Sequence, residues 1–240
     1  QIDYYLARDD DGRSTLKTIE KITAEFPNID QNHGIERAIP RQYDGHSTSL
    51  DIASVKDEQG NGLDYSTYDS NGNEVLRIGD ADTYVHGSKT YVIEYAQRDV
   101  TRYFADTGSD EFYWDTNGVD WRVPIQKLTV NVYIEDGLKS QLTSSRTCYI
   151  GYAGVNQLCE ITEKEGVLSV MTNNLNLGQN VTVAFGFEPR TFAAHQPSLL
   201  EKLVKIWVRV MAISSVVAFG LLVWVVSRWR QAKNRLSEIG

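Results

Sequence analysis

The pattern of apolar and polar residues separates one long apolar stretch near the end of the chain from many short stretches before it. Residues 210–227 contain no charged side chain, and Arg209 and Arg228 bound them. At about 1.5 Å of rise per residue, a helix of this length nearly crosses a hydrocarbon core of roughly 30 Å. A buried core helix is the alternative, but such a helix normally carries a polar face. The pattern therefore predicts a transmembrane helix over residues 203–230.

The first 190 residues show the pattern of short strands joined by turns. Asp, Asn and Gly gather between the apolar stretches, which is typical of β-turns. Between Leu16 and Phe26 the apolar residues fall mostly on every second position, and this period predicts a half-buried strand. Further strands are predicted at residues 2–7, 49–56, 74–78, 90–97, 126–134, 147–152, 167–172 and 180–187.

Many short strands with frequent turns predict a mainly β fold of the sandwich or barrel type. We favour a β-sandwich built from two packed immunoglobulin-like modules over one merged sandwich, with a boundary near residues 121–124. Pro189 and Pro197 mark the connection to the helix. The expected parts are a β-sandwich module over 1–122, a second β module over 123–190, a linker over 191–202, the transmembrane helix over 203–230 and a tail over 231–240.

Charge is distributed unevenly along the chain. The net charge is −8, to which residues 1–200 contribute −13 and residues 201–240 contribute +5. So acidic a domain argues against nucleic acid as a partner. A basic cluster follows the span and marks the cytoplasmic side by the positive-inside rule. We therefore expect a single-pass protein of the cell membrane, with the bilayer around residues 203–230, the N-terminal domain outside and the C-terminus in the cytoplasm.

The two cysteines of the chain, Cys148 and Cys159, lie in a segment that has the pattern of a hairpin. An even pair at this spacing favours a disulfide, and hence an oxidising compartment, over two free thiols. Export of the domain would need a signal peptide, which we expect to have been removed. Two cysteines cannot complete a structural zinc site, and the four histidines are scattered, so we expect no metal.

Two stretches stand out from generic strand sequence: residues 33–40, HGIERAIP, and residues 110–121, DEFYWDTNGVDW. Between them come Ile78-Gly79-Asp80 and residues 91–95, YVIEY. In order and spacing these motifs resemble the bacterial YciQ-like predicted membrane proteins, whose ectodomain is domain of unknown function 2207. The resemblance covers nearly all of residues 1–190. It implies a membrane topology and no particular activity, and Asp115 departs from the family's usual Asn.

The acidic and aromatic residues of 110–121 form the candidate site. Aromatic rings beside carboxylates suit stacking on sugar rings, and carboxylate oxygens also suit Ca²⁺. We favour a structural interpretation, in which the large aromatic side chains fill the core, with Trp114 or Trp121 largely buried, and the acids face water. Arg37 could pair with Asp110 or Glu111 in a buried ion pair. The candidate binding residues are Asp110, Glu111, Tyr113, Trp114, Asp115, Trp121 and Arg37.

Together these patterns favour a membrane-anchored, extracytoplasmic β-rich domain of the bacterial cell envelope. We expect a non-enzymatic binding or assembly role without a cofactor. One alternative is a carbohydrate-binding or carbohydrate-cleaving module that uses residues 110–121, for which cleavage would need two carboxylates at a fixed separation. Another is a subunit of a larger membrane complex. Besides lipid, the expected partners are therefore envelope glycan or other membrane subunits.

Overall fold

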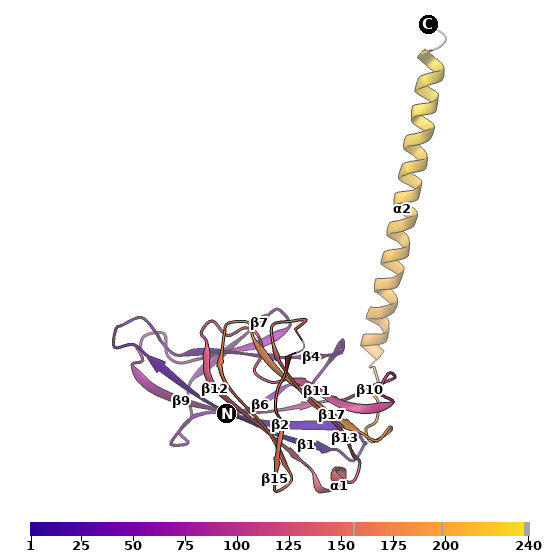
Figure 1. Cartoon of the computed structure of the whole chain (residues 1–240). Helices are drawn as coiled ribbons and strands as arrows, with labels where there is room; N and C mark the ends of the chain where they lie inside the picture. Colours follow the sequence, from indigo (N-terminus) through magenta and orange to yellow (C-terminus); the bar gives the residue numbers. More distant parts are fainter. Residues whose placement is uncertain (156, 198, 238–240) are drawn as a thin grey trace. The chain divides into compact units, whose positions relative to one another are not determined.

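The computed structural model describes residues 1–155, 157–197 and 199–237. The chain forms two units, Gln1–His195 and Gln196–Gly240 (Figure 1). We call the first unit the β domain, because its secondary structure is mainly strand. The second unit contains the long helix α2 (Leu199–Ser237). The expected fold class, a mainly β sandwich followed by one apolar helix, is therefore confirmed.

The largest sheet has seven strands in the order β15-β16-β12-β1-β2-β9-β6. Its strands are β1 (Ile2–Arg8), β2 (Ser14–Phe26), β6 (Asp51–Asp57), β9 (Gly87–Arg98), β12 (Ile125–Ile134), β15 (Thr162–Lys164) and β16 (Val167–Leu175). The short helix α1 (Asp136–Lys139) follows β12.

The other sheets have five, three and two strands, in the orders β10-β11-β17-β13-β14, β3-β8-β7 and β4-β5. The five-stranded sheet consists of β10 (Arg102–Phe104), β11 (Ser109–Asp115), β13 (Leu142–Gly151), β14 (Gln157–Leu158) and β17 (Asn180–Phe187). The smaller sheets consist of β3 (Ile35–Pro40), β7 (Tyr65–Ser70), β8 (Asn73–Ile78), β4 (Gln42–Tyr43) and β5 (His46–Ser47).

Two hydrophobic cores lie on the same face of the seven-stranded sheet. In the first core, Leu16 of β2 packs in a cluster with Phe112 and Phe185 of the five-stranded sheet. In the second core, Ile22 of β2 packs in a cluster with Leu76 of the three-stranded sheet. Leu16 and Ile22 occupy positions of the same parity, and successive side chains of a strand alternate between faces. The five-stranded and three-stranded sheets therefore cover different parts of one face.

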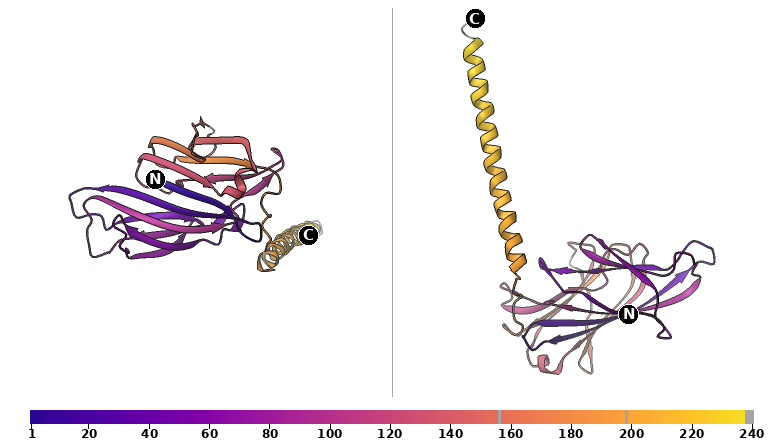
Figure 2. Two further views of the ribbon diagram at one scale, coloured as in Figure 1. Left: turned by 90° about the horizontal axis from the view of Figure 1, so that it is seen from below. Right: turned by 180° about the vertical axis from the view of Figure 1, so that it is seen from behind.

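Strands from both sides of residue 122 share the two larger sheets, in which they meet at the β1-β12 pair and the β11-β17 pair. β1 pairs in parallel with β12, from Ile2 opposite Val130 to Leu6 opposite Ile134. Figure 2 shows indigo and purple strands of the early chain beside pink and orange strands of the later chain. The expected division into modules over 1–122 and 123–190 is therefore corrected, because long-range pairing merges both segments into one unit. Periodicity in the sequence locates strands, but it does not identify their partners.

The β domain continues into the segment expected to be a linker. Phe192 is buried and packs edge-on against Phe187, with ring centroids 5.2 Å apart. The amide of Ala193 donates to the carbonyl of Gly12 at 2.8 Å. Residues 191–195 therefore belong to the folded domain, and the expected linker over 191–202 is shorter than predicted.

The helix α2 contains the expected span of residues 203–230. Lys202–Trp229 is the one described helical stretch long and apolar enough to cross a membrane, by length and composition, and it is not buried. The helix continues to Ser237, so most of the expected tail over 231–240 is helical, while residues 238–240 lie outside the described residues.

Candidate functional site

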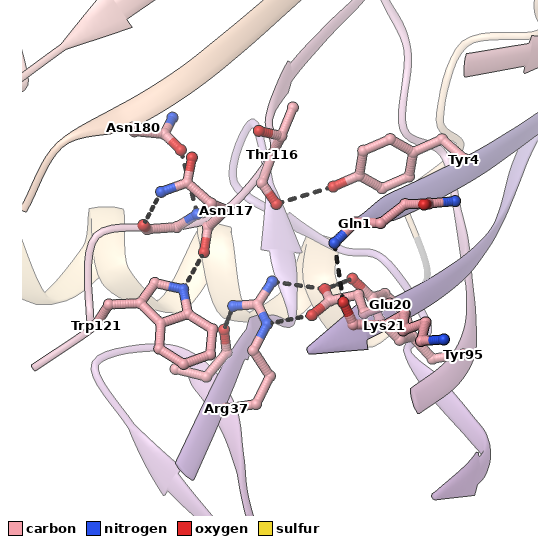
Figure 3. Close-up of polar contacts among 12 residues, drawn as sticks. Gln1, Tyr4, Glu20, Lys21, Arg37, Tyr95, Thr116, Asn117, Trp121 and Asn180 are labelled. Atoms are coloured by element: carbon pink, nitrogen blue, oxygen red, sulfur yellow. Dashed lines mark hydrogen bonds and ion pairs between the residues drawn. The ribbon is translucent and has the colours of Figure 1, made fainter. Parts of the chain in front are cut away.

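The two stretches that stand out in the sequence meet where Arg37 lies beside Trp121 (Figure 3). Arg37 comes from β3, and Trp121 comes from the loop after β11, with the guanidinium carbon 5.8 Å from the centroid of the indole ring. Strands β1, β2 and β9 bring further polar side chains to the same place. We call this set the junction cluster, and its members are Tyr4, Glu20, Arg37, Tyr95, Thr116, Asn117 and Trp121.

A buried ion pair forms the centre of the junction cluster. Nε and Nη2 of Arg37 each donate to a carboxylate oxygen of Glu20 at 2.7 Å. The exposed fractions of the two side chains are 4% for Arg37 and 1% for Glu20. The hydroxyl of Tyr95 donates to the same carboxylate at 2.7 Å. The expected pairing of Arg37 with Asp110 or Glu111 is therefore wrong, because Glu20 occupies the inward face of β2.

The protonation states of the cluster follow from its burial and its charges. Burial by itself lowers the pKa of the Arg37 guanidinium, but the charge and hydrogen bonds of Glu20 outweigh this effect and raise it. Burial, followed by the charge of Glu20, raises the pKa of the Tyr95 hydroxyl well above its ordinary value. Arg37 therefore stays charged and Tyr95 stays a hydrogen-bond donor at neutral pH. The enclosed pair suits a role in packing, since no substrate reaches side chains this buried.

Asn117 and Trp121 connect the end of β11 to the start of β17. The side-chain amide of Asn117 donates to the carbonyl of Gln179 and accepts from the amide of Val181, both at 2.9 Å. The indole Nε1 of Trp121 donates to the carbonyl of Asn117 at 2.9 Å. Gly118 has a φ of +72°. The turn at residues 116–118 therefore holds the end of β11 against the start of β17, and Trp121 packs onto this turn through its hydrogen bond to Asn117.

Two glycines explain another pair of sequence motifs. Gly34 precedes β3 and Gly79 follows β8, with φ values of +143° and +133°. A Cβ atom on Gly34 would lie 1.9 Å from the carbonyl oxygen of Ile78, and one on Gly79 would lie 1.9 Å from that of His33. Only glycine permits this backbone approach and these dihedrals. The motifs His33-Gly34-Ile35 and Ile78-Gly79-Asp80 therefore mark the place where the start of β3 meets the end of β8.

Trp114 is part of the first core. Its side chain is 5% exposed, and its ring stacks on that of Phe112 with centroids 5.8 Å apart. The ring of Tyr43 lies 5.5 Å away on the β4-β5 hairpin. The prediction that Trp114 or Trp121 is largely buried is therefore confirmed by Trp114, while Trp121 is partly exposed.

Asp110 and Glu111 do not face water as the structural interpretation expected, because both are buried. Asp110 accepts from the backbone amide of Phe192 at 3.0 Å, so it anchors residues 191–195. Glu111 accepts from the hydroxyls of Thr107 and Ser109 at 2.6 and 3.2 Å. Both carboxylates therefore hold local backbone segments in place.

The remaining candidates lie on the outward face of the five-stranded sheet. The side chain of Tyr113 is 39% exposed, and Asp115 is also exposed. Asp115 accepts from the hydroxyl of Thr182 on β17 at 2.5 Å. Partial burial, and then the charge of Asp115, raises the pKa of the Tyr113 hydroxyl. The alternation along β11 therefore splits the candidate residues between the core and an accessible sheet face.

The predicted disulfide is present between Cys148 and Cys159, whose Cα atoms are 5.0 Å apart. The amide of Cys159 donates to the carbonyl of Cys148 at 2.9 Å, beside the pairing of β13 with β14. The bond therefore closes the expected hairpin. Across the part of the chain that is described, no three His, Cys, Asp or Glu side chains are placed to hold a metal ion.

The model of the DUF2207 family, the N-terminal domain of predicted membrane proteins, matches residues 3–187. The chain belongs to this family. The DUF2207 match ends shortly before residues 191–195, which complete the folded unit. The resemblance found in the sequence is thereby confirmed. No curated protein matches the chain.

Solved structures similar to this DUF2207 protein include leukotriene A4 hydrolase from Saccharomyces cerevisiae and a putative protease from Parabacteroides distasonis. The first aligns at 12% identity with a TM-score of 0.43, covering 78% of this chain and 28% of that one. The second aligns at 11% identity with a TM-score of 0.39, covering 76% and 39%. The chain therefore spans well under half the length of either protein. At these scores the likeness carries no argument about activity.

Sequence reasoning missed several members of the junction cluster in this DUF2207 domain, including Glu20, Tyr95 and Asn117. One signal was present for Glu20, because it interrupts the apolar face of β2 with an acid. Such a residue needs a buried partner of opposite charge. Which arginine supplies that partner depends on how β2 and β3 are placed, and the sequence pattern does not contain this information.

Proposed function

We propose that the β domain lies outside the cytoplasmic membrane, anchored by α2, and serves a non-enzymatic binding or assembly role in the bacterial cell envelope. The disulfide between Cys148 and Cys159 carries this proposal. Disulfides persist in oxidising compartments and are rare in the cytosol. A domain with this bond, on a chain with an apolar helix, therefore fits the outer side of the membrane.

The charge distribution supports the same orientation. Residues 1–200 carry −13, whereas residues 201–240 carry +5. An anionic inner leaflet attracts each nearby Lys or Arg by about 1 kcal/mol and repels an acidic domain. Arg228, next to the apolar stretch, also contacts the ring of Trp224, with the guanidinium carbon 5.6 Å from the centroid. The attraction of the basic residues and the repulsion of the acidic domain both favour an orientation with the basic C-terminal end in the cytoplasm.

Protease protection tests the orientation. Protease is added to intact protoplasts that carry the full chain with a C-terminal epitope tag, and a cytoplasmic enzyme serves as the control for lysis. We expect digestion of the β domain, while α2 and the tag survive as one short protected fragment. Survival of the β domain until lysis would overturn the proposal, as would two free thiols in protein isolated without reductant.

Carbohydrate binding is a second candidate role, and the outward half of β11 favours it. Tyr113 and Asp115 share this face with Thr182 and Ala184, whose short side chains leave the tyrosine ring accessible. An exposed ring suits stacking on a sugar, and a carboxylate accepts hydrogen bonds from sugar hydroxyls. The buried Trp114 does not take part, so this surface is smaller than the one expected from the sequence.

Sedimentation of the full chain, in detergent, with purified insoluble cell-wall glycan tests this second role. We expect the wild-type chain to co-sediment, and Tyr113→Ala to reduce the bound fraction severalfold. Tyr84→Ala, which removes an exposed tyrosine from another part of the domain, provides the matched control. Equal binding by all three proteins, or none by the wild type, would exclude Tyr113 as a sugar platform.

A further inference from the structure

We propose that the outward face of the five-stranded sheet binds an extended glycan chain without anionic groups, across Tyr113 of β11 and Tyr149 of β13. This inference rests on the carbohydrate-binding role proposed above and defines the ligand more closely. Residues directly opposite in paired strands share a face, as do residues two apart on one strand. Tyr113 lies opposite Ala184, and Tyr149 lies opposite Thr182, two positions away on β17. The two tyrosines therefore lie on the same face.

The strand between the two tyrosines carries short side chains on this face. β17 lies between β11 and β13, and it contributes Thr182 and Ala184. Neighbouring strands are about 4.8 Å apart and residues rise about 3.4 Å along a strand, so roughly 12 Å separates the Cα atoms of Tyr113 and Tyr149. This distance is longer than one sugar ring. A ligand that contacts both tyrosines is therefore a chain of several rings, which passes over the short residues of β17.

Apolar side chains extend this surface beyond each tyrosine. The ring of Phe104 on β10 lies beside that of Tyr113, with centroids 6.1 Å apart. On the other side, Leu158 of β14 lies opposite Tyr149, and its side chain is 68% exposed. The disulfide described above holds β14 beside β13. Accessible aromatic rings with apolar neighbours suit the apolar C–H faces of sugar rings, while the tyrosine hydroxyls remain in water.

Asp115 determines the charge of the ligand that this face accepts. Its carboxylate accepts the hydroxyl proton of Thr182, and no cationic side chain among the described residues pairs with it. Arg102, whose guanidinium lies over the ring of Phe104, is already paired with Asp44. An unpaired carboxylate accepts hydrogen bonds from sugar hydroxyls but repels phosphate and carboxylate groups. The face therefore favours a glycan without anionic groups.

Two stacking positions on one rigid sheet make the affinity depend on the length of the glycan. A single sugar ring contacts one tyrosine at a time. A chain that reaches both Tyr113 and Tyr149 gains the second contact without losing translational and rotational freedom a second time. An oligomer long enough to span the two positions therefore binds much more tightly than its monomer, and either tyrosine is needed for this gain.

Equilibrium dialysis of the full chain in lipid nanodiscs tests this inference, with empty nanodiscs as the background. The probes are labelled N-acetylglucosamine and its β-1,4-linked tetramer. We expect the tetramer to bind about tenfold or more tightly than the monomer. Tyr149→Ala should remove most of this difference. Tyr103→Ala is the matched control, because Tyr103 is also exposed but lies opposite the buried Asp110, on the other face of the sheet, so this variant should bind both probes normally.

A third probe tests the selectivity for charge. The tetramer of galacturonic acid carries a carboxylate on each ring, and it should bind the wild-type chain severalfold more weakly than the uncharged tetramer. Asp115→Asn keeps an acceptor for Thr182 and removes the charge, so it should reduce this difference. Equal affinity of the wild-type chain for the two tetramers would overturn the proposal.

The outcomes also separate this inference from the role on which it rests. If neither the monomer nor the tetramer binds, both the sugar platform at Tyr113 and the extended chain are refuted. If the tetramer binds no better than the monomer and only Tyr113→Ala weakens binding, Tyr113 stacks on a single ring and the extended chain alone is refuted. If Tyr149→Ala does not fold, Tyr149→Leu keeps an apolar side chain without a flat ring and gives the same comparison.

Discussion

Tyr113 and Trp114 are neighbours in sequence but lie on opposite faces of β11, so they should differ in their effect on stability. Trp114→Ala should lower the free energy of unfolding by about 3–5 kcal/mol, as is usual for a buried Trp. Tyr113→Ala, at a 39% exposed side chain, should cost about 1 kcal/mol or less. Denaturant unfolding followed by far-UV circular dichroism measures both. Similar losses in the free energy of unfolding would mean that Tyr113 and Trp114 are assigned to the wrong faces of β11.

The ion pair between Glu20 and Arg37 makes a different prediction at the residue scale. Glu20→Gln leaves the Arg37 guanidinium buried without its counter-charge and should cost about 3–5 kcal/mol. Replacing both residues with Met should cost much less than the sum of the single changes, because no unpaired charge remains. The matched control is Glu58→Gln at the exposed pair with Lys21, which should cost about 1 kcal/mol or less. If the double change lowered the free energy of unfolding by the sum of the two single changes, this account would be contradicted.

Much at this scale was inaccessible from the sequence. The large aromatic residues of 110–121 predicted that Trp114 or Trp121 is buried, but they did not decide between the two. The pairing of Glu20 with Arg37 was not predicted, because the two residues come from strands in different sheets. A buried pair depends on how sheets pack, and local patterns of polarity carry little information about that.

At the scale of elements, the junction of β3 and β8 depends on glycine at two positions. Gly34→Ala would place a methyl group 1.9 Å from the carbonyl oxygen of Ile78, so the backbone must move. We expect a loss of several kcal/mol in the free energy of unfolding, and faster amide exchange at the ends of β3 and β8. Gly62→Ala is the control, because nothing lies within 4 Å of its added Cβ. Equal stability of the two variants would refute the close approach.

The sequence predicted elements well where one face is buried. The strand over residues 180–187 has the predicted bounds, and β2 shows the expected alternation. β7 was not predicted, because its residues are nearly all exposed and show no contrast between faces. The seven-stranded sheet was also not predicted, since strand order depends on contacts between distant segments. Local periodicity therefore identified most strands, but the topology came from the structure.

At the scale of the whole molecule, the shared sheets predict that the β domain does not divide at residue 122. A fragment of residues 1–122 lacks β12 as the partner of β1 and β17 as the partner of β11. A fragment of residues 123–240 lacks β1 as the partner of β12 and β11 as the partner of β17. We expect neither fragment to show cooperative unfolding or dispersed amide resonances, whereas the full chain shows both. A cooperative transition in the isolated 1–122 fragment would restore the two-module description.

The parallel pairing of β1 with β12 also sets an order of events during biosynthesis. Ile2 pairs with Val130, so the first strand waits for a partner synthesised 128 positions later. At roughly 5–20 residues per second, this delay lasts on the order of 6 to 26 seconds. Until then one edge of β1 exposes unpaired amides and carbonyls, which can template pairing with other chains. Until β12 has emerged, this edge of the nascent domain is therefore a site at which two unfinished chains can pair with each other.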